Sequence, residues 1–390
     1  MTDPAGIAPS APGRAHPPVA PLRALTALRF VAAAYVLVFH YARFFFPEAA
    51  IPAPIGLGYS GVTFFFLLSG FILAYNYHAV DLREPGARAR FRRARVARVY
   101  PVYLLSLALA LPWLAAWVAK SAPPLQGLMA ASAVLAPLGL HAWVPGAACA
   151  LNCPSWSVSV ELVFYALFPV LLPLALRTPG RTAALTLAAW GALAAAASLA
   201  FARYAPGASL IDPTGTGPVL LAQAIKYNPL LRLPEFVAGL LLYAASRRVR
   251  IPTGGLLGLA ALAALGLVAA APHLPEVVLH NGLTALAWAP LILAGAQMRS
   301  GPLVAPGFVF LGRISFALYL IHAPAYALVN SLDRAALGGR LRDLPWLGAG
   351  LAAALALGFS VALHRLVEEP ARRRILRAGG PAREPAPASP

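Results

Sequence analysis

Charged side chains are scarce in this chain: only 11% of its 390 residues are Asp, Glu, Lys or Arg. A soluble domain usually carries about 25%. Because 60% of the residues are hydrophobic and the mean hydropathy is +0.71, the composition excludes an ordinary soluble fold and indicates a polytopic membrane protein. The apolar residues form runs of about 20, the length of helix that crosses roughly 30 Å of hydrocarbon.

Acidic residues are fewer still, 13 against 31 Lys and Arg, which leaves a net charge of +18. In a soluble protein this excess would suggest a nucleic-acid partner. In a membrane protein, Lys and Arg collect on cytoplasmic loops and meet anionic lipid. We therefore expect membrane lipid, and no nucleic acid, as a partner.

Cysteine is nearly absent. Cys149 and Cys153 lie in the loop segment CALNCP, and two cysteines are too few for a disulfide framework or a zinc site. No metal is expected. The two thiols would bridge each other in an oxidising compartment or stay unpaired otherwise, and the sequence leaves both open.

We expect neither a signal peptide nor a long polar segment in this chain. Residues 1–20 are rich in Pro and Ala without a hydrophobic stretch. We expect 1–21 and 375–390 to be disordered cytoplasmic segments. Residues 22–374 are expected to form one membrane-embedded domain, with no separate soluble domain.

Ten apolar segments predict an all-α fold of about ten transmembrane helices, because ten-residue alternating strands are absent. The predicted spans are about 22–45, 56–78, 98–119, 156–176, 182–202, 228–247, 254–271, 277–297, 308–330 and 346–367. A shorter apolar piece, about 126–142, is expected to be re-entrant or interfacial.

The distribution of Lys and Arg predicts the orientation. With the N-terminus inside, the inner side receives about three times as many basic residues as the outer side. Both termini are then cytoplasmic. The loop between the last two spans fits least well, because it holds three arginines and two aspartates.

Ionisable side chains occur within these spans. Arg29 and His40 stand eleven positions apart in the first one, about 16 Å along a helix. A charge at the centre of the membrane costs roughly 3 kcal/mol on insertion scales, so such residues usually serve a site. Comparable residues at compatible depths in other spans are Glu161, Arg232, Glu235 and His322.

Each of these residues also has a plain structural interpretation. His40 could be an interfacial histidine, His322 could support packing, and Trp156 could be an interface aromatic. Arg232 and Glu235, three residues apart on one helix, could simply neutralise each other. Their joint occurrence favours a functional site.

The inner segment FRRARVARVYPVY carries a dense group of arginines where the chain re-enters the membrane. Such a run can anchor the topology, or it can bind a phosphorylated cytoplasmic ligand through bidentate guanidinium groups. Tyr100 could contact an adenine ring. No Walker-type phosphate loop is present, so ATP hydrolysis has no support. The arginines in question are Arg92, Arg93, Arg95 and Arg98.

From about residue 22 to 374 the chain resembles the integral-membrane acyltransferase family 3, which includes bacterial O-acetyltransferases of surface polysaccharides, lipopolysaccharide, Nod factors and macrolide antibiotics. The resemblance rests on Arg29 with His40 and on six motifs in the family's order. These are GVTFFFLLSGF, RRARVARVYPVY, SWSVSVELVFYALFP, NPLLRLPEFVAG, LGRISFALYLIHAP and EEPARR.

The resemblance implies a multi-pass protein of the bacterial cytoplasmic (inner) membrane that takes an acyl group, expected to be acetyl, from cytoplasmic acyl-CoA. The acceptor would be a hydroxyl of a carbohydrate or small molecule on the membrane or outer side. His40 and Arg29 match the family's essential histidine and arginine, and Glu161 its acidic residue. Acyl-CoA is the only cosubstrate expected.

Imidazole suits a general base near neutral pH, so we expect His40 to take the hydroxyl proton and Glu161 to orient it. Arg29 and the inner arginines would hold the donor. Arg232, Ser69 and His322 are candidates for oxyanion donors, and Trp156, Ser159 and Glu235 for supporting roles. The alternative function is a transporter or flippase of a glycolipid or small solute, which uses similar intramembrane residues.

Overall fold

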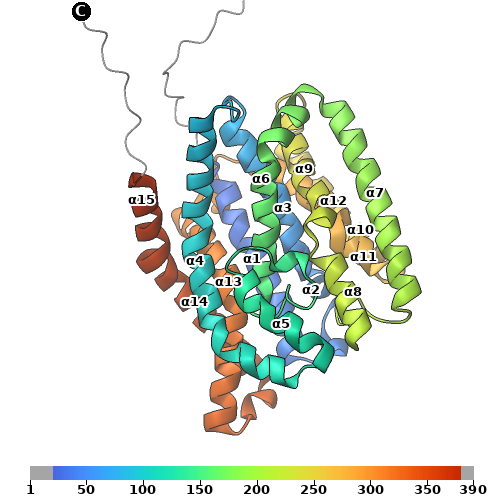
Figure 1. Ribbon diagram of the computed structural model, residues 1–390. Helices are drawn as coiled ribbons and strands as arrows, with labels where there is room; N and C mark the ends of the chain where they lie inside the picture. Colours follow the sequence, from blue (N-terminus) through green and yellow to red (C-terminus); the bar gives the residue numbers. More distant parts are fainter. Residues whose placement is uncertain (1–20, 379–390) are drawn as a thin grey trace, which may run out of the picture.

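The computed structural model describes residues 21–378, and every regular element in that range is a helix (Figure 1). Nine of the described helices are long and apolar enough to cross a membrane. The predicted all-α polytopic fold is thereby confirmed. The segments predicted to be disordered lie almost wholly outside the described residues, although α15 (Glu369–Arg377) continues past the expected boundary at 374.

All ten predicted spans coincide with helices. In chain order these are α1 (Arg23–Phe45), α3 (Gly61–Tyr77), α4 (Pro85–Lys120), α6 (Trp156–Arg177), α7 (Pro179–Tyr204), α9 (Pro229–Ser246), α10 (Thr253–Ala270), α12 (Ala285–Gln297) preceded by the short α11 (Glu276–Val278), α13 (Pro306–Leu332) and α14 (Pro345–Leu363). The shorter helices are α2 (Ala53–Gly56), α5 (Pro123–Leu135) and α8 (Thr216–Lys226). Helix α9 is not among the nine apolar ones, because it carries Arg232 and Glu235.

Proline begins many of these helices, including α4, α7, α9, α13 and α14. The first residues of a helix have no intrahelical partner for their N–H groups, so the missing donor of proline costs nothing there. The loops between spans can therefore be short and still stop and restart helices sharply.

The outermost helices present apolar side chains to the surroundings. In α7 and α10 only 17% of the most apolar stretch of each helix is buried inside the protein. Their leucines, such as Leu187, Leu199, Leu262 and Leu265, are more than half exposed. A soluble protein does not expose contiguous apolar faces of this kind. These two helices therefore face lipid.

Glycines bring the site-bearing helices into close contact. A Cβ on Gly312 of α13 would lie 1.9 Å from the carbonyl oxygen of Thr26 in α1. A Cβ on Gly239 of α9 would lie 2.0 Å from the carbonyl oxygen of Leu67 in α3. Small residues permit such backbone approach in membranes. As a result α1 packs along α13 and α3 along α9, which carries His40 toward His322.

The arginine-rich connections lie at one end of the helices. The turns between α3 and α4 and between α6 and α7 are at the top of Figure 1, while α5 and α8 lie at the lower end. This separation agrees with the orientation predicted from charge, and we name the arginine-rich end inner and the other end outer.

Two predicted segments are less regular than expected. The span at 277–297 is broken: a π-helix (Leu279–Leu283) contains Asn281 and Gly282 in non-helical conformations, Gly282 with φ +119°. The piece at 126–142 forms helix α5 and then turns into an irregular outer loop that runs to Ser155.

Candidate active site

Two histidine rings from α1 and α13 contact each other near the outer end. His322 Nε2 lies 3.2 Å from His40 Nδ1, and the ring centroids are 4.9 Å apart. The hydroxyl of the neighbouring Tyr41 donates a hydrogen bond to the carbonyl of His322 at 2.9 Å, which fixes the two helices at this level.

The hydrogen bonds of the pair decide where the protons are. His322 Nδ1 lies 2.6 Å from the carbonyl oxygen of Tyr319, and a carbonyl only accepts, so Nδ1 carries the proton. In the neutral ring His322 Nε2 is then an acceptor. His40 Nδ1 faces this acceptor and the carbonyl of Val36 at 2.9 Å, so it must be a donor. The remaining nitrogen, His40 Nε2, keeps its lone pair.

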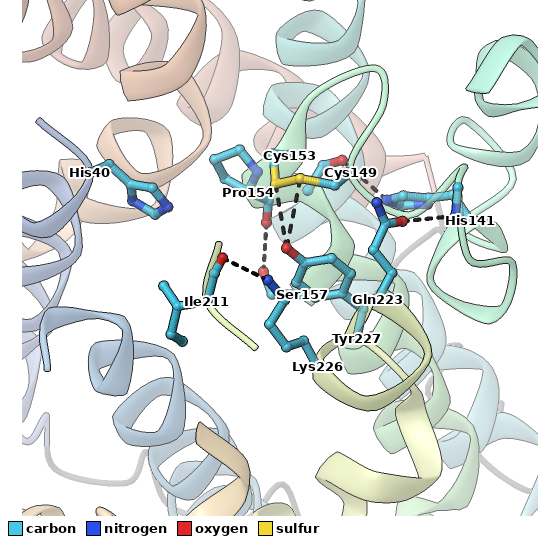
Figure 2. The surroundings of a disulfide bond; sticks show 12 residues. His40, His141, Cys149, Cys153, Pro154, Ser157, Ile211, Gln223, Lys226 and Tyr227 are labelled. Atoms are coloured by element: carbon cyan, nitrogen blue, oxygen red, sulfur yellow. Dashed lines mark hydrogen bonds between the residues drawn. A yellow bond between two sulfur atoms is a disulfide. The ribbon is translucent and has the colours of Figure 1, made fainter. Parts of the chain in front are cut away.

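His40 lines a cavity of about 540 Å³ that we call the outer cavity. The ring faces a wall formed by Cys149, Cys153, Lys226 and Tyr227 (Figure 2). Among the described residues no hydrogen bond engages His40 Nε2. The nitrogen that can take a proton is thus the one available to a molecule in the cavity.

The wall opposite His40 is held by a disulfide bond. Cys149 and Cys153 are bridged, which settles the question that the sequence left open. The Tyr227 hydroxyl lies 3.7 Å and 3.8 Å from their sulfurs (Figure 2). Disulfides persist in oxidising compartments, so the bridge agrees with an outer location for this loop.

Charged groups border the same cavity. Arg43 forms an ion pair with Asp212. Lys226 Nζ donates to the carbonyl of Ile211 at 3.2 Å (Figure 2) and lies over the ring of Tyr227. Burial lowers the pKa of Lys226 to about 8, and the nearby Glu276 carboxylate opposes this shift. The outer cavity is therefore polar as well as aromatic.

A second cavity of about 190 Å³, the inner cavity, lies toward the arginine-rich end and is lined by Arg29, Ser69, Arg95, Arg98 and Glu161. The Nε atoms of Arg29 and Arg95 are buried and have no hydrogen-bond partner among the described residues. Buried donors of this kind are normally satisfied. An anionic ligand in the cavity would supply the acceptors.

The two cavities share part of their walls. Val62 of α3 and Tyr319 of α13 line both. Tyr319 stands one turn before His322 on the same helix. Its backbone carbonyl accepts the hydrogen bond from His322 Nδ1. A thin layer of side chains therefore separates the arginine-lined space from the space at His40.

Glu161 does not contact His40, contrary to the orienting role expected from the sequence. It lines the inner cavity and accepts a hydrogen bond from Ser69 Oγ at 3.0 Å. Ser157, Glu161 and Tyr165 recur at four-residue spacing and line the inner cavity together, whereas Trp156 is turned toward the outer one. The orienting partner of His40 is His322.

Contacts within the protein remove two of the three expected oxyanion donors, His322 and Arg232. His322 is fully buried, and its Nδ1–H donates a hydrogen bond to the backbone carbonyl of Tyr319. Arg232 lines neither cavity: its Nε pairs with Glu235 at 3.0 Å, and its Nη1 donates to the His280 carbonyl and to Asn281 Oδ1 at 3.1 Å. Arg232 and Glu235 thus neutralise each other and hold a helix break. Of the three, only Ser69 lines a cavity.

The remaining predicted residues separate into two groups. Arg98 lines the inner cavity but is ion-paired with Glu368, a partner that sequence spacing could not indicate. Three do not line it: Arg92 is exposed, Arg93 is half-buried, and the Tyr100 ring packs edge-on against Tyr103. Ser159 donates to the carbonyl of Gly139 at 2.5 Å and supports the outer loop.

Residues missed by the sequence reasoning also line the outer cavity. Tyr59, Gln223, Lys226 and His280 belong to this group. Within the part of the chain that the structure describes, no group of three or more His, Cys, Asp and Glu side chains could hold a metal ion. The site offers imidazole and guanidinium groups instead.

The inner cavity of this helical membrane protein is lined by arginines. Beyond the shared wall, His40 Nε2 has no hydrogen-bond partner among the described residues. This is the layout of an intramembrane group-transfer enzyme. The family described as an acyltransferase domain, acyltransferase family 3, matches residues 22–365. The chain belongs to this family and is an acyltransferase. The transporter alternative has no such support.

Two relatives extend this result. Acyltransferase MdmB of Streptomyces mycarofaciens is 30% identical over 96% of this chain and 97% of its own length. Protein 2 in the picA locus of Rhizobium radiobacter is 38% identical over 85 residues, which are 22% of this chain and 41% of that protein. No solved structure gives a significant match.

Proposed function

We propose that this enzyme transfers an acetyl group from cytoplasmic acetyl-CoA to a hydroxyl group of an acceptor bound in the outer cavity. The observation that carries the proposal is the free Nε2 of His40, held as an acceptor by His322 and Val36. It lies in a cavity that shares Val62 and Tyr319 with the arginine-lined inner cavity.

The donor would enter from the inner side. Arg29 and Arg95 present buried Nε donors without partners in the described residues, which suits the phosphates of CoA. Arg92 and Arg93, further toward the inner end of α4, would attract the nucleotide at the surface. The pantetheine arm would then carry the thioester toward the wall formed by Tyr319.

Once the side chains of Val62 and Tyr319 have moved aside, the acceptor hydroxyl attacks the thioester carbonyl carbon while its proton passes to His40 Nε2. The tetrahedral intermediate collapses with cleavage of the carbon–sulfur bond. The imidazolium returns the proton to the departing thiolate, so the products are the ester and CoA thiol. Ser69 lines the inner cavity but donates its one hydroxyl proton to Glu161, so it would have to turn from Glu161 to act as the oxyanion donor.

The proposed acceptor is a carbohydrate hydroxyl of the cell envelope, with a secreted small molecule such as a macrolide as the second choice. The outer cavity is lined by both aromatic and polar side chains, among them Tyr59, Trp156, Gln223 and Tyr227, which suits a sugar. The enzyme would act in the bacterial cytoplasmic membrane, with no cofactor besides acyl-CoA.

The test is whether the purified protein in lipid nanodiscs releases CoA thiol from acetyl-CoA when acceptor hydroxyls are offered. We expect release and the appearance of an acetyl ester, and loss of both in His40→Ala protein that remains monodisperse. Normal transfer by this variant would overturn the base assignment. Transport of a glycolipid without thiol release would overturn the enzyme proposal.

A further inference from the structure

A second imidazole lines the outer cavity and has no part in the mechanism above. His280 lies in the π-helix Leu279–Leu283, where Asn281 and Gly282 interrupt a membrane-spanning segment. Its side chain is 6% exposed. Irregular backbone at membrane depth is tolerated where it is buried in protein or lines a cavity, and such breaks often mark binding sites.

The proton of His280 can be placed from its neighbours. Asn281 Nδ2 donates to the carbonyl of Ile225 at 3.0 Å, so Asn281 Oδ1 is the acceptor of that amide. His280 Nδ1 lies 2.8 Å from this oxygen and 3.3 Å from the donor Arg232 Nη1. Because the oxygen is the closer partner and only accepts, Nδ1 carries the proton. In the neutral ring, His280 Nε2 is an acceptor with a free lone pair.

The buried Arg232 holds this arrangement. Its Nη1 donates to the carbonyl of His280 and to Asn281 Oδ1, while Glu235 balances its charge and Thr63 Oγ1 donates to Glu235 at 2.8 Å. Arg232 Nη1 and His280 Nδ1 therefore share Asn281 Oδ1 as their acceptor. The break in the helix is thus fixed by an ion pair that lines neither cavity.

No hydrogen bond engages His280 Nε2 within residues 21–378. The ring stacks on Tyr59 at 5.0 Å with an interplanar angle of 20°, and Tyr59 also lines the outer cavity. Phe39 connects the two imidazoles, with its ring 5.0 Å from His40 and 5.6 Å from Tyr59. Trp156 and Tyr227 provide further aromatic surface in the same cavity.

We propose that His280 Nε2 accepts a hydrogen bond from a second hydroxyl of the acceptor, one that is not acylated. The inference rests on the proposed function and deepens it. An acceptor with one hydroxyl at His40 and another at His280 is a polyhydroxylated molecule, and the aromatic rings beside both imidazoles suit the apolar face of a sugar ring. His280 is then a specificity residue, and Asn281 and Arg232 are its positioning residues.

The experiment uses the full-length protein in nanodiscs with acetyl-CoA. The acceptor probes are phenyl β-D-glucoside and its four monodeoxy analogues. Two variants are compared with the unaltered protein: His280→Leu removes the acceptor nitrogen, and His280→Gln keeps an acceptor atom near the position of Nε2. Release of CoA thiol in buffer without a sugar reports the donor side alone, and size-exclusion profiles report folding.

The unaltered protein is expected to use one monodeoxy analogue about tenfold less well than the parent, the effect of one lost hydrogen bond to a buried group. His280→Leu should raise the KM for the parent about tenfold and leave the KM for that analogue unchanged. His280→Gln should recover most of the lost discrimination.

Three results would overturn the inference. An equal loss on the parent and all analogues would mean that His280 recognises no hydroxyl. Thiol release by the unaltered protein without transfer to any of the sugars would overturn the inference and the carbohydrate acceptor, and would leave only the use of acetyl-CoA as donor in place. Absence of thiol release under every condition would instead refute the proposed function, and the inference with it.

Discussion

His322 Nε2 faces His40 Nδ1 at 3.2 Å, on the opposite side of the His40 ring from the nitrogen that is open to the outer cavity. In hydrolases a carboxylate occupies the equivalent position behind a catalytic histidine. Here a second neutral imidazole and the Val36 carbonyl fill it. This arrangement fixes the tautomer without adding a charge inside the membrane, where a charge is costly.

Replacing His322 should reduce the rate without abolishing it. In His322→Leu the His40 Nδ1 proton still has the Val36 carbonyl at 2.9 Å, so the ring keeps its tautomer but loses one of two constraints. We expect kcat to fall about 10- to 100-fold, within the usual contribution of a positioned base, with the KM for acetyl-CoA unchanged. His322→Gln, which keeps an acceptor, should recover part of the loss.

Steady-state kinetics with varied acetyl-CoA measure this difference, and His40→Ala provides the reference for complete loss. If His322→Gln were no better than His322→Leu, the role of His322 would be packing. A rise in the KM for acetyl-CoA with unchanged kcat would place His322 on the donor side.

The inner arginines should distinguish between donors. Arg29→Gln is expected to raise the KM for acetyl-CoA about 10- to 150-fold, because a hydrogen bond to a charged group is worth about 1.5–3 kcal/mol. The KM for S-acetylpantetheine, which lacks the nucleotide, should change little. Arg203→Gln is the matched control, since Arg203 is exposed at the outer end of α7 and does not line the inner cavity. Equal effects of Arg29→Gln on both donors would contradict phosphate binding.

The helices could be predicted from the sequence because bilayer thickness sets the length of each apolar run. Arg29 and His40 could be found for the same reason: they interrupt an apolar segment. Depth along a helix can be estimated from rise per residue, but rotation about its axis cannot. Glu161 was therefore assigned to His40, whereas its face of α6 is turned toward the inner cavity.

Contacts between helices could not be predicted from the sequence either, because the rotation of each helix about its axis was unknown. His40 and His322 are 282 residues apart, and only close packing at Gly312 brings their helices together. His280 was missed because 277–297 was treated as an unbroken span. The available signal was Asn281 and Gly282 directly after it, two residues that are unfavourable in a helix interior.

Tyr319 should keep the thioester from water. Its side chain lines both cavities, so Tyr319→Ala is expected to join them and let water from the outer side reach the donor. Hydrolysis of acetyl-CoA without an acceptor should rise several-fold, while transfer to an added acceptor falls. Tyr319→Phe retains the ring and serves as the control. If both variants hydrolysed acetyl-CoA equally fast, the hydroxyl and not the bulk of Tyr319 would matter.

Lys226 offers a test of both orientation and electrostatics. The sequence contains two lysines, Lys120 and Lys226, so Lys226 is the only one left in a Lys120→Arg variant. Burial lowers the pKa of Lys226 from 10.5 to about 8. Only the neutral amine reacts with an activated ester. Labelling of the folded protein should therefore rise as the pH passes through about 8, and labelling of the unfolded protein only near 10.5.

A membrane-impermeant sulfonated ester applied to sealed cells, followed by peptide mass spectrometry, measures this labelling. Because Lys226 lines the outer cavity, the reagent should reach it from outside. Labelling only after the membrane is opened would reverse the orientation predicted from the arginines. Labelling from outside with a midpoint near 10.5 would mean that water fills the cavity around Lys226, because a solvated ammonium does not lose its proton at pH 8.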